Sequence, residues 1–238
     1  RKFFTMDYLR DYVKILSFYK LNELQVHLND NGFVEFFGND WNKTYAAFRL
    51  ESERYPGLTA KDGSYTKAEF RDFQKMAASY GVNVIPEIDV PAHSCAALAA
   101  YPELACPVVK DKITVLPGLG GRNPEMIYCA GNEKVFAFLQ DVIDEMLQLF
   151  PSPYINMGGD EATKTYWKVC PLCQKRMQEE HLKEVEDLQG YFMGRLNDYI
   201  RSKGRILMGW DELTNSQLPE GAVILGWQGL GNAALKAA

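Results

Sequence analysis

The feature of the sequence that most constrains its fold is a repeated alternation of short apolar runs with longer amphipathic stretches. The short runs are rich in β-branched residues and occupy residues 23–28, 82–88, 154–157, 205–210 and 223–227. The longer stretches, at residues 6–19, 66–80, 133–150 and 188–202, place apolar side chains at helical spacing. Such an alternation is typical of parallel strands joined by crossover helices, so we expect an α/β fold.

Capping residues mark the ends of the expected helices. Thr66 followed three residues later by Glu69 is a capping-box pattern, and Asn132 can cap the helix that follows it. Gly81 and Gly204 each follow a helical stretch at the position where a chain leaves a helix. These signals support the same division into helices and strands.

Two connections are too long to be simple turns, residues 29–65 and 89–131. Each follows the C-terminal end of an expected strand, where β/α barrels build their active-site loops. No linker or low-complexity tract interrupts the chain, so we expect one domain over residues 1–238.

Composition and charge favour a globular protein, and they argue against nucleic-acid binding and against a membrane span. The chain has 238 residues, 47% of them hydrophobic, which suffices for a substantial buried core. The net charge of −5 is spread along the chain without a basic stripe, so we do not expect a nucleic-acid partner. No apolar run approaches the roughly 18 to 20 residues of a membrane span.

The five cysteines form an odd set that leaves the redox compartment open. Cys170 and Cys173 have the spacing of two zinc ligands, but a structural zinc site normally has four, and no second Cys-x-x-Cys or His-x-x-x-His occurs. We therefore expect ordinary thiols or a local disulfide rather than a metal site.

Polar and aromatic side chains gather after the expected strands. They are His27 and Asp30, then Glu87, Asp89 and His93, then Asp160 and Glu161, and finally Trp210, Asp211, Glu212 and Trp227. Any one of them alone would more often be a hydrogen-bonded surface or packing residue. Their recurrence at one face of the sheet favours a functional site.

The strongest local pattern is Met157-Gly158-Gly159-Asp160-Glu161. Two glycines allow a tight turn and a close approach to a ligand, and two carboxylates follow at once. Neighbouring carboxyl groups can divide their work, one staying protonated and one ionised. Cleavage of a glycosidic bond needs such a division, between a proton donor and a negative charge beside an oxocarbenium-like centre.

These residues resemble the hallmark Gly-Gly-Asp-Glu run of glycoside hydrolase family 20, the β-N-acetylhexosaminidases. The segments 27–30, 86–94 and 96–104 and the residue Arg1 are also similar to family motifs. The resemblance spans nearly the whole chain. It implies a (β/α)8 TIM barrel, of which residues 1–238 would form a partial catalytic domain with about strands 2 to 6 and the end of strand 1. We expect the native protein to be longer and to supply the missing barrel strands.

The resemblance also implies the reaction, which is removal of β-linked N-acetylglucosamine or N-acetylgalactosamine from glycans with retention of configuration. In this family the substrate's own acetamide oxygen attacks the anomeric carbon, giving an oxazolinium intermediate. Glu161 would then be the general acid and base, and Asp160 would orient the acetamide and stabilise the positive intermediate. Neither carboxylate would attack the sugar.

The remaining roles follow from the same resemblance. His93 with Asp30 would relay protons to Glu161, and Asp89 would support His93. Residues expected to bind substrate are Arg1, His27, Asp89, Trp210 and Trp227. The partners would be oligosaccharides or glycoconjugates carrying β-linked N-acetylhexosamine. No cofactor and no metal are expected, and the resemblance favours an exported protein, periplasmic, secreted or lysosomal.

Two alternatives remain open from the residues alone. A metal-dependent barrel hydrolase could use the ligands His27, Asp30, Asp89, His93 and Asp160. A carbohydrate-binding protein without catalysis would need only aromatic walls such as Trp210 and Trp227 around the sugar. The small number of histidines weakens the first alternative, and the presence of both Asp160 and Glu161 weakens the second.

Overall fold

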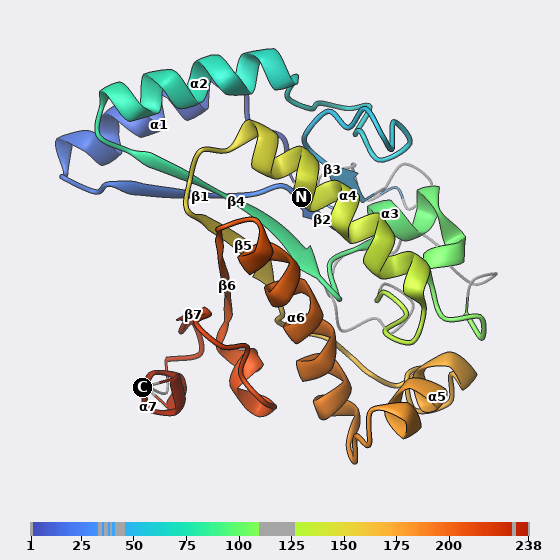
Figure 1. Ribbon diagram of the computed structural model, residues 1–238. Helices are drawn as coiled ribbons and strands as arrows, with labels where there is room; N and C mark the ends of the chain where they lie inside the picture. The colour runs from blue at the N-terminus through green and yellow to red at the C-terminus, as the bar shows by residue number, and fades with distance from the viewer. Residues whose placement is uncertain are drawn as a thin grey trace.

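A five-stranded parallel sheet forms the centre of the molecule (Figure 1). The computed structural model describes residues 2–32, 35, 38, 40, 46–109, 127–229 and 232–237. The sheet order follows the chain: β1 (Glu23–His27), β4 (Asn83–Val90), β5 (Tyr154–Gly158), β6 (Ile206–Trp210) and β7 (Val223–Leu225). All four neighbouring pairs are parallel. The five strands and the α/β class predicted from the sequence are therefore confirmed.

One helix precedes the first strand of the sheet, and further helices connect its first four strands, as Figure 1 shows. The long ones are α1 (Met6–Phe18), α2 (Lys67–Ser79), α4 (Glu133–Leu149) and α6 (Val185–Ser202). Each buries one apolar stripe; in α1 this stripe is Leu9, Val13 and Leu16. Among the described residues, no helix combines the length and apolar character that crossing a bilayer requires.

The predicted caps are present at the helix starts. The Thr66 hydroxyl accepts a hydrogen bond from the Glu69 backbone N–H, and the Glu69 carboxylate accepts one from the Thr66 backbone N–H. The Asn132 side chain accepts a bond from the backbone N–H of Lys134 at 3.1 Å. These bonds satisfy donors that a helix leaves open in its first turn.

Several short elements are absent from the sequence-based prediction. They are the antiparallel pair β2 (Asn29–Asp30) and β3 (Ala47–Phe48), the helices α3 (Cys95–Ala100), α5 (Pro171–Glu179) and α7 (Asn232–Ala237), and the 3-10 helices Pro102–Leu104 and Asp211–Asn215. Most lie in the connections that follow the strands. None is long enough to show a clear period of its own.

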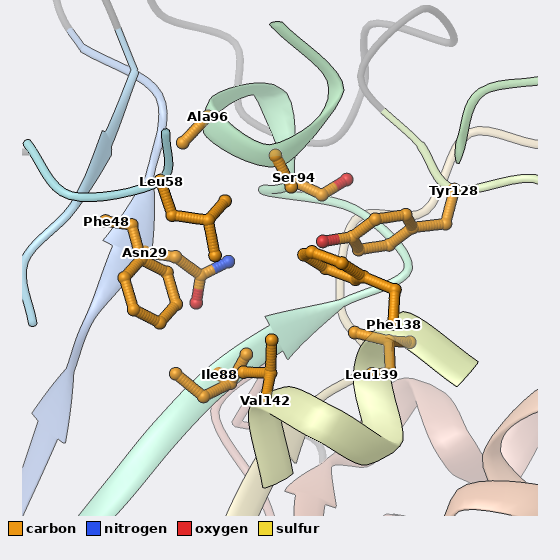
Figure 2. A pocket seen from close by; sticks show the side chains of 11 residues that line it. Asn29, Phe48, Leu58, Ile88, Ser94, Ala96, Tyr128, Phe138, Leu139 and Val142 are labelled. Carbon is orange, nitrogen blue, oxygen red and sulfur yellow. The ribbon is translucent and has the colours of Figure 1, made fainter. Parts of the chain in front are cut away.

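A small internal cavity lies between the β4 end and α4 (Figure 2). Figure 2 shows Asn29 and Leu58 on one side of it and Tyr128 and Phe138 on the other. Its volume of ≈ 10 Å³ is room for about one water molecule. This cavity is too small for a sugar ring, so a substrate site has to lie elsewhere.

Candidate active site

The carboxyl ends of the parallel strands bring the predicted site residues to one open cavity of ≈ 300 Å³. His27 ends β1, Asp160 and Glu161 follow β5, and Trp210 ends β6. The cavity is lined by His27, Asp30, Glu87, Asp89, His93, Asp160, Glu161, Trp210 and Trp227. Every residue given a catalytic or binding role is in this set except Arg1, which lies outside the described residues; Asp211 and Glu212, which were grouped with them, do not line this cavity.

Asp30 joins the two histidines of the site. Its Oδ2 lies 3.0 Å from Nε2 of His27, and its Oδ1 lies 3.0 Å from Nδ1 of His93. Asp30 occupies β2, whose pairing with β3 fixes its backbone beside the end of β1. One carboxylate therefore orients both imidazole rings.

The other side of His93 faces the carboxyl groups at the end of β5. Nε2 of His93 lies 3.3 Å from Oδ2 of Asp160 and 3.7 Å from Oε2 of Glu161. The same nitrogen lies 3.6 Å from Oδ2 of Asp89. His93 thus lies at the centre of the site, between Asp30 and the adjacent Asp160 and Glu161.

Two catalytic candidates have an unusual backbone conformation. His93 has φ of 52° and Glu161 has φ of 49°, in the left-handed region that side chains other than glycine rarely adopt. Such conformations cost of order 1–3 kcal/mol and persist where the surrounding structure enforces them. Both residues are therefore held in place by their neighbours.

Asp89 is buried beneath this layer and packs against the glycine pair. Its side chain accepts a hydrogen bond from the Gly159 backbone N–H at 3.2 Å. Its backbone is held by Asn29, whose side chain accepts from the Asp89 N–H at 2.8 Å and donates to the Asp89 and His93 carbonyls. Asn29 consequently fixes the loop that carries His93.

Asn29 was not among the predicted site residues, and Glu87 was grouped with them at the strand ends but given no role. Glu87 is 1% exposed and accepts hydrogen bonds from Gln25 and from the Trp210 indole, each at 2.9 Å. It also lies 2.9 Å from Nδ1 of His27. The available signal was an acidic residue inside an apolar strand, since a buried carboxylate needs partners.

The two tryptophans differ in how firmly they are held. Trp210 donates its indole N–H to buried Glu87, whereas Trp227 donates to Glu212 at 2.9 Å and remains 49% exposed. Both line the cavity, as predicted. Trp210 is the rigid wall of the cavity, and Trp227 is its more open wall.

The carboxylates set the protonation of the histidines. Burial alone would lower the pKa of His27, but Asp30 and Glu87 raise it to about 10. Burial acts in the same direction on His93, and there Asp160 and Asp30 raise the pKa to about 11. Both imidazoles are therefore cations at neutral pH.

The pKa values of the carboxyl groups are shifted in opposite directions. Burial would raise the pKa of Asp30 and of Asp160, yet the adjacent imidazolium cations hold both below their usual range. Burial raises the pKa of Asp89 well above its usual range despite the nearby His93. Asp30 and Asp160 thus carry negative charge while Asp89 holds its proton more tightly.

A second open cavity of ≈ 440 Å³ adjoins the first. Glu161 and Trp227 line both cavities, whereas Asp160 lines only the first. Lys164, Gln189 and Glu212 are among the polar side chains of the second cavity. Glu161 therefore stands at the boundary of two spaces, with Asp160 on one side only.

Two groups of side chains in the site have the spacing of metal ligands: His27 with Glu87 and Asp89, and Asp89 with His93 and Asp160. An imidazole has to be unprotonated to bind a metal. Neighbouring carboxylates raise the pKa of both histidines, so a metal would have to displace a proton from each ring.

The cysteines depart from the prediction. All five are free thiols, and Cys106 and Cys129 lie beside Cys170 and Cys173 in one buried cluster. The expected ordinary thiols are present, and the local disulfide given as their alternative is not. The cluster was not predicted, because the count of possible ligands considered only residues close in sequence. The fold supplies the two sulfur atoms that the Cys-x-x-Cys pattern lacks.

Comparison with known proteins agrees with the geometry of the site. The family described as "Glycosyl hydrolase family 20, catalytic domain" matches residues 1–238, the whole chain. The chain is 36% identical over 234 residues to a protein of Porphyromonas gingivalis named "Beta-hexosaminidase", covering 93% of this chain and 28% of that protein. It therefore spans less than a third of the length of this curated relative.

Solved structures show the same similarity. A β-N-acetylhexosaminidase from Bacteroides fragilis has a TM-score of 0.79 at 32% identity, covering 99% of this chain and 46% of that one. A chitobiase from Flavobacterium johnsoniae has a TM-score of 0.84 at 27% identity, covering 99% and 34%. These catalytic domains are TIM barrels, so the predicted barrel class is confirmed, and the five-stranded sheet forms part of such a barrel.

Proposed function

Because the chain belongs to glycosyl hydrolase family 20, we propose that residues 1–238 act as part of the catalytic barrel of a β-N-acetylhexosaminidase. The enzyme removes β-linked N-acetylglucosamine or N-acetylgalactosamine from glycans by substrate-assisted, retaining catalysis through an oxazolinium intermediate. The observation that carries this proposal is the Asp160–Glu161 pair, which faces His93 at the wall of an open cavity.

The two cavities support the assignment of the roles. A glycosidic oxygen lies between the sugar that is released and the leaving group, so its proton donor has to stand between two binding spaces. Glu161 lines both cavities, which suits the general acid. Asp160 lines only the cavity with the two tryptophans, which suits a carboxylate that orients the acetamide.

The charge of Asp160 supports its role in stabilising the intermediate. His93 keeps the pKa of Asp160 low, so the carboxylate is ionised when positive charge develops on the acetamide. A fixed negative group in a partly buried site costs no reorganisation during the reaction. Asp160 is 16% exposed, so solvent weakens its field only in part.

His93 and Asp30 act as a positioning pair for the two carboxylates. Asp30 fixes the ring through Nδ1 and leaves Nε2 directed at Asp160 and Glu161. Nε2 of His93 lies 3.7 Å from Oε2 of Glu161, so the ring faces the carboxyl group that is the proton donor in this proposal. Asp89 lies below and limits the movement of His93.

Trp210 and Trp227 form the apolar part of the substrate cavity. Indole faces pack well against pyranose rings and methyl groups. The acetamide methyl group is the part of the substrate that distinguishes an N-acetylhexosamine from a plain hexose. Packing of the acetamide against this wall would also exclude water from the oxazolinium ion.

We also infer that further barrel strands pair with β1 and β7 in the complete protein. These strands form the two edges of the described sheet, and each leaves one side without a parallel neighbour there. The relatives that match this chain are two to three times as long, or longer. Closure of the barrel would satisfy the backbone groups at both edges.

The proposal is tested with the complete protein and chromogenic glycosides. We expect hydrolysis of an aryl β-N-acetylglucosaminide and no measurable hydrolysis of the matching β-glucoside, which lacks the acetamide nucleophile. A thiazoline that mimics the oxazolinium should inhibit competitively. Equal turnover of the two glycosides, or failure of the thiazoline to inhibit, would contradict substrate assistance.

A further inference from the structure

Four of the five cysteines converge at a point that is not part of the cavity lining. Cys106 and Cys129 lie in the connection between β4 and α4, and Cys170 and Cys173 lie at the start of α5. All four are at most 1% exposed, and none lines the candidate active site. They are therefore available for a separate role.

The sulfur atoms have the spacing of a tetrahedral metal site. Sγ of Cys173 lies 3.8 Å from that of Cys106 and 3.7 Å from that of Cys129, and Sγ of Cys129 lies 3.7 Å from that of Cys170. All four sulfur atoms lie within 4.8 Å of one another. With zinc–sulfur bonds of about 2.3 Å, a regular tetrahedron places its sulfur atoms about 3.8 Å apart.

The backbone around the cluster is fixed independently of the sulfur atoms. An isolated antiparallel bridge joins Ala105 to Tyr128, the residues that directly precede Cys106 and Cys129. The Cys129 N–H donates to the Leu104 carbonyl at 3.0 Å. The four thiols are therefore brought together by the fold itself.

Close packing holds α5 against this bridge. A Cβ atom at Gly131 would lie 2.1 Å from the Leu172 carbonyl oxygen, so only glycine permits the observed contact. The Trp167 indole N–H donates to the Tyr128 carbonyl at 2.9 Å. This packing fixes the start of α5, which carries Cys170 and Cys173, relative to the bridge beside Cys106 and Cys129.

We propose that Cys106, Cys129, Cys170 and Cys173 bind one zinc ion in a structural site. Four thiolates at tetrahedral spacing are a donor set that zinc prefers, and a closed site of this kind leaves no position for substrate. Cys170 caps α5 and Cys173 lies in its first turn, where the helix dipole stabilises negative charge. The site is thus structural and not catalytic.

Two disulfides are the main alternative for four neighbouring cysteines. A disulfide requires sulfur atoms about 2.05 Å apart, and one bond would leave the remaining sulfurs to pair in the same small space. Here Cys173 has two sulfur neighbours at nearly equal distance, and Cys129 also has two. Shared neighbours are expected around a central ion and are not expected for separate pairs.

The ion would join two active-site loops at their base. Cys106 and Cys129 belong to the connection that also carries His93, and Cys170 and Cys173 follow the segment that carries Asp160 and Glu161. A metal bond between these connections limits their relative movement. We therefore expect the zinc to maintain the distance between His93 and the two carboxylates.

The test is the metal content of the complete protein, produced without a metal-affinity tag and dialysed against a chelator. We expect one zinc per chain by elemental mass spectrometry. An organomercurial reagent should release this zinc from the wild type as the four cluster thiols react, and a chromogenic zinc indicator measures the release. Cobalt replacement should give the thiolate charge-transfer and visible bands of a tetrahedral sulfur site.

Cysteine variants locate the site. Cys106→Ser and Cys173→Ser should lose at least nine-tenths of the bound zinc, whereas Cys95→Ser should retain all of it. Cys95 is equally buried but does not belong to the cluster, so it is a matched control. If a cluster variant fails to fold, the mercurial and cobalt experiments on the wild type still decide the question.

Several results would overturn the proposal. Non-reducing peptide mapping that shows disulfides among the four cysteines would exclude the site. Four alkylatable thiols without stoichiometric metal would do the same, as would zinc retained by both cluster variants. Stoichiometric iron in place of zinc would refute the identity of the ion.

Discussion

The backbone of Gly158 lies directly against the carboxyl group of Asp89. A Cβ atom at position 158 would lie 1.8 Å from Oδ1 of Asp89, and Gly158 has φ of 67°. The N–H of the next residue donates a hydrogen bond to the same oxygen. This contact fixes the turn from which Asp160 and Glu161 project.

The Gly158→Ala variant should therefore lose activity and stability together. The new methyl group would displace Asp89 or the turn, and we expect a loss of about 3 kcal/mol in unfolding free energy and at least a hundredfold loss in kcat/KM. Gly204→Ala is the control, because Gly204 has a similar φ of 71° with no atom within 4 Å of a built Cβ. Chemical denaturation that gives both variants equal stability would contradict the contact.

Glu161→Gln should abolish hydrolysis of substrates that need a protonated leaving group. The amide keeps the shape of the side chain but cannot donate the proton, so we expect kcat to fall by roughly 10² to 10⁴. The loss should be much smaller for a dinitrophenyl glycoside, whose leaving group departs as a stable anion. An equal loss for both glycosides would argue against a proton donor at Glu161.

Asp160→Asn should reduce kcat through a different step. The amide removes the negative charge that opposes the oxazolinium ion, so we expect a loss of roughly 10² to 10³ that does not depend on the leaving group. Binding of the thiazoline inhibitor should weaken in parallel, since it resembles that ion. Calorimetry that finds unchanged thiazoline affinity would refute this role.

The pH dependence of stability should report the charge of His93. Its pKa is raised from 6.5 to about 11, so its stabilising ion pairs are fully present below about pH 6.5 and are lost as pH rises towards 11. The stability difference between wild type and His93→Asn should fall by up to about 1.4 kcal/mol per pH unit over this range. Denaturation curves at several pH values measure it, with His181→Asn as an exposed control. A difference that stays constant from neutral to alkaline pH would show that His93 is uncharged.

Trp210→Phe tests the wall of the cavity. Phenylalanine keeps an aromatic ring but leaves Oε1 of buried Glu87 without its indole donor, so we expect KM to rise roughly tenfold. Trp227→Phe is the comparison, because its bond to Glu212 is exposed and its loss should cost less. Steady-state kinetics on the N-acetylglucosaminide distinguish the two variants. Equal increases in KM would contradict the conclusion that Trp210 is held more firmly than Trp227.

Local patterns account for the parts of the fold that the sequence predicts. The buried stripe of α1 and the Thr66–Glu69 capping box depend on residues within one or two helical turns. The pairing of Asn29 with Phe48 joins residues 19 positions apart through a ladder of two residues, and such short pairing has no periodic signal. The starts and ends of the main strands follow from apolar runs, and the short elements follow from tertiary contacts.

The residues that gather at the site could be predicted from the sequence, but the contacts between their side chains could not. Parallel strands bring their carboxyl ends together, so residues after each strand could be assigned to one place. The sharing of Asp30 between His27 and His93 depends on the exact path of the chain after β1. The cysteine cluster has the same origin, since Cys106 and Cys173 are 67 residues apart and become neighbours only in the folded chain.

The cavity lining has a consequence for the glycans that can enter it. Five carboxyl groups and two imidazoles line this space, so acidic side chains outnumber basic ones there. The wall therefore has an excess of negative charge, which suits a neutral sugar that becomes positive during cleavage. Sulfated or uronic acid units meet like charge there, so anionic modification of a glycan would protect it from this site without any change in the protein.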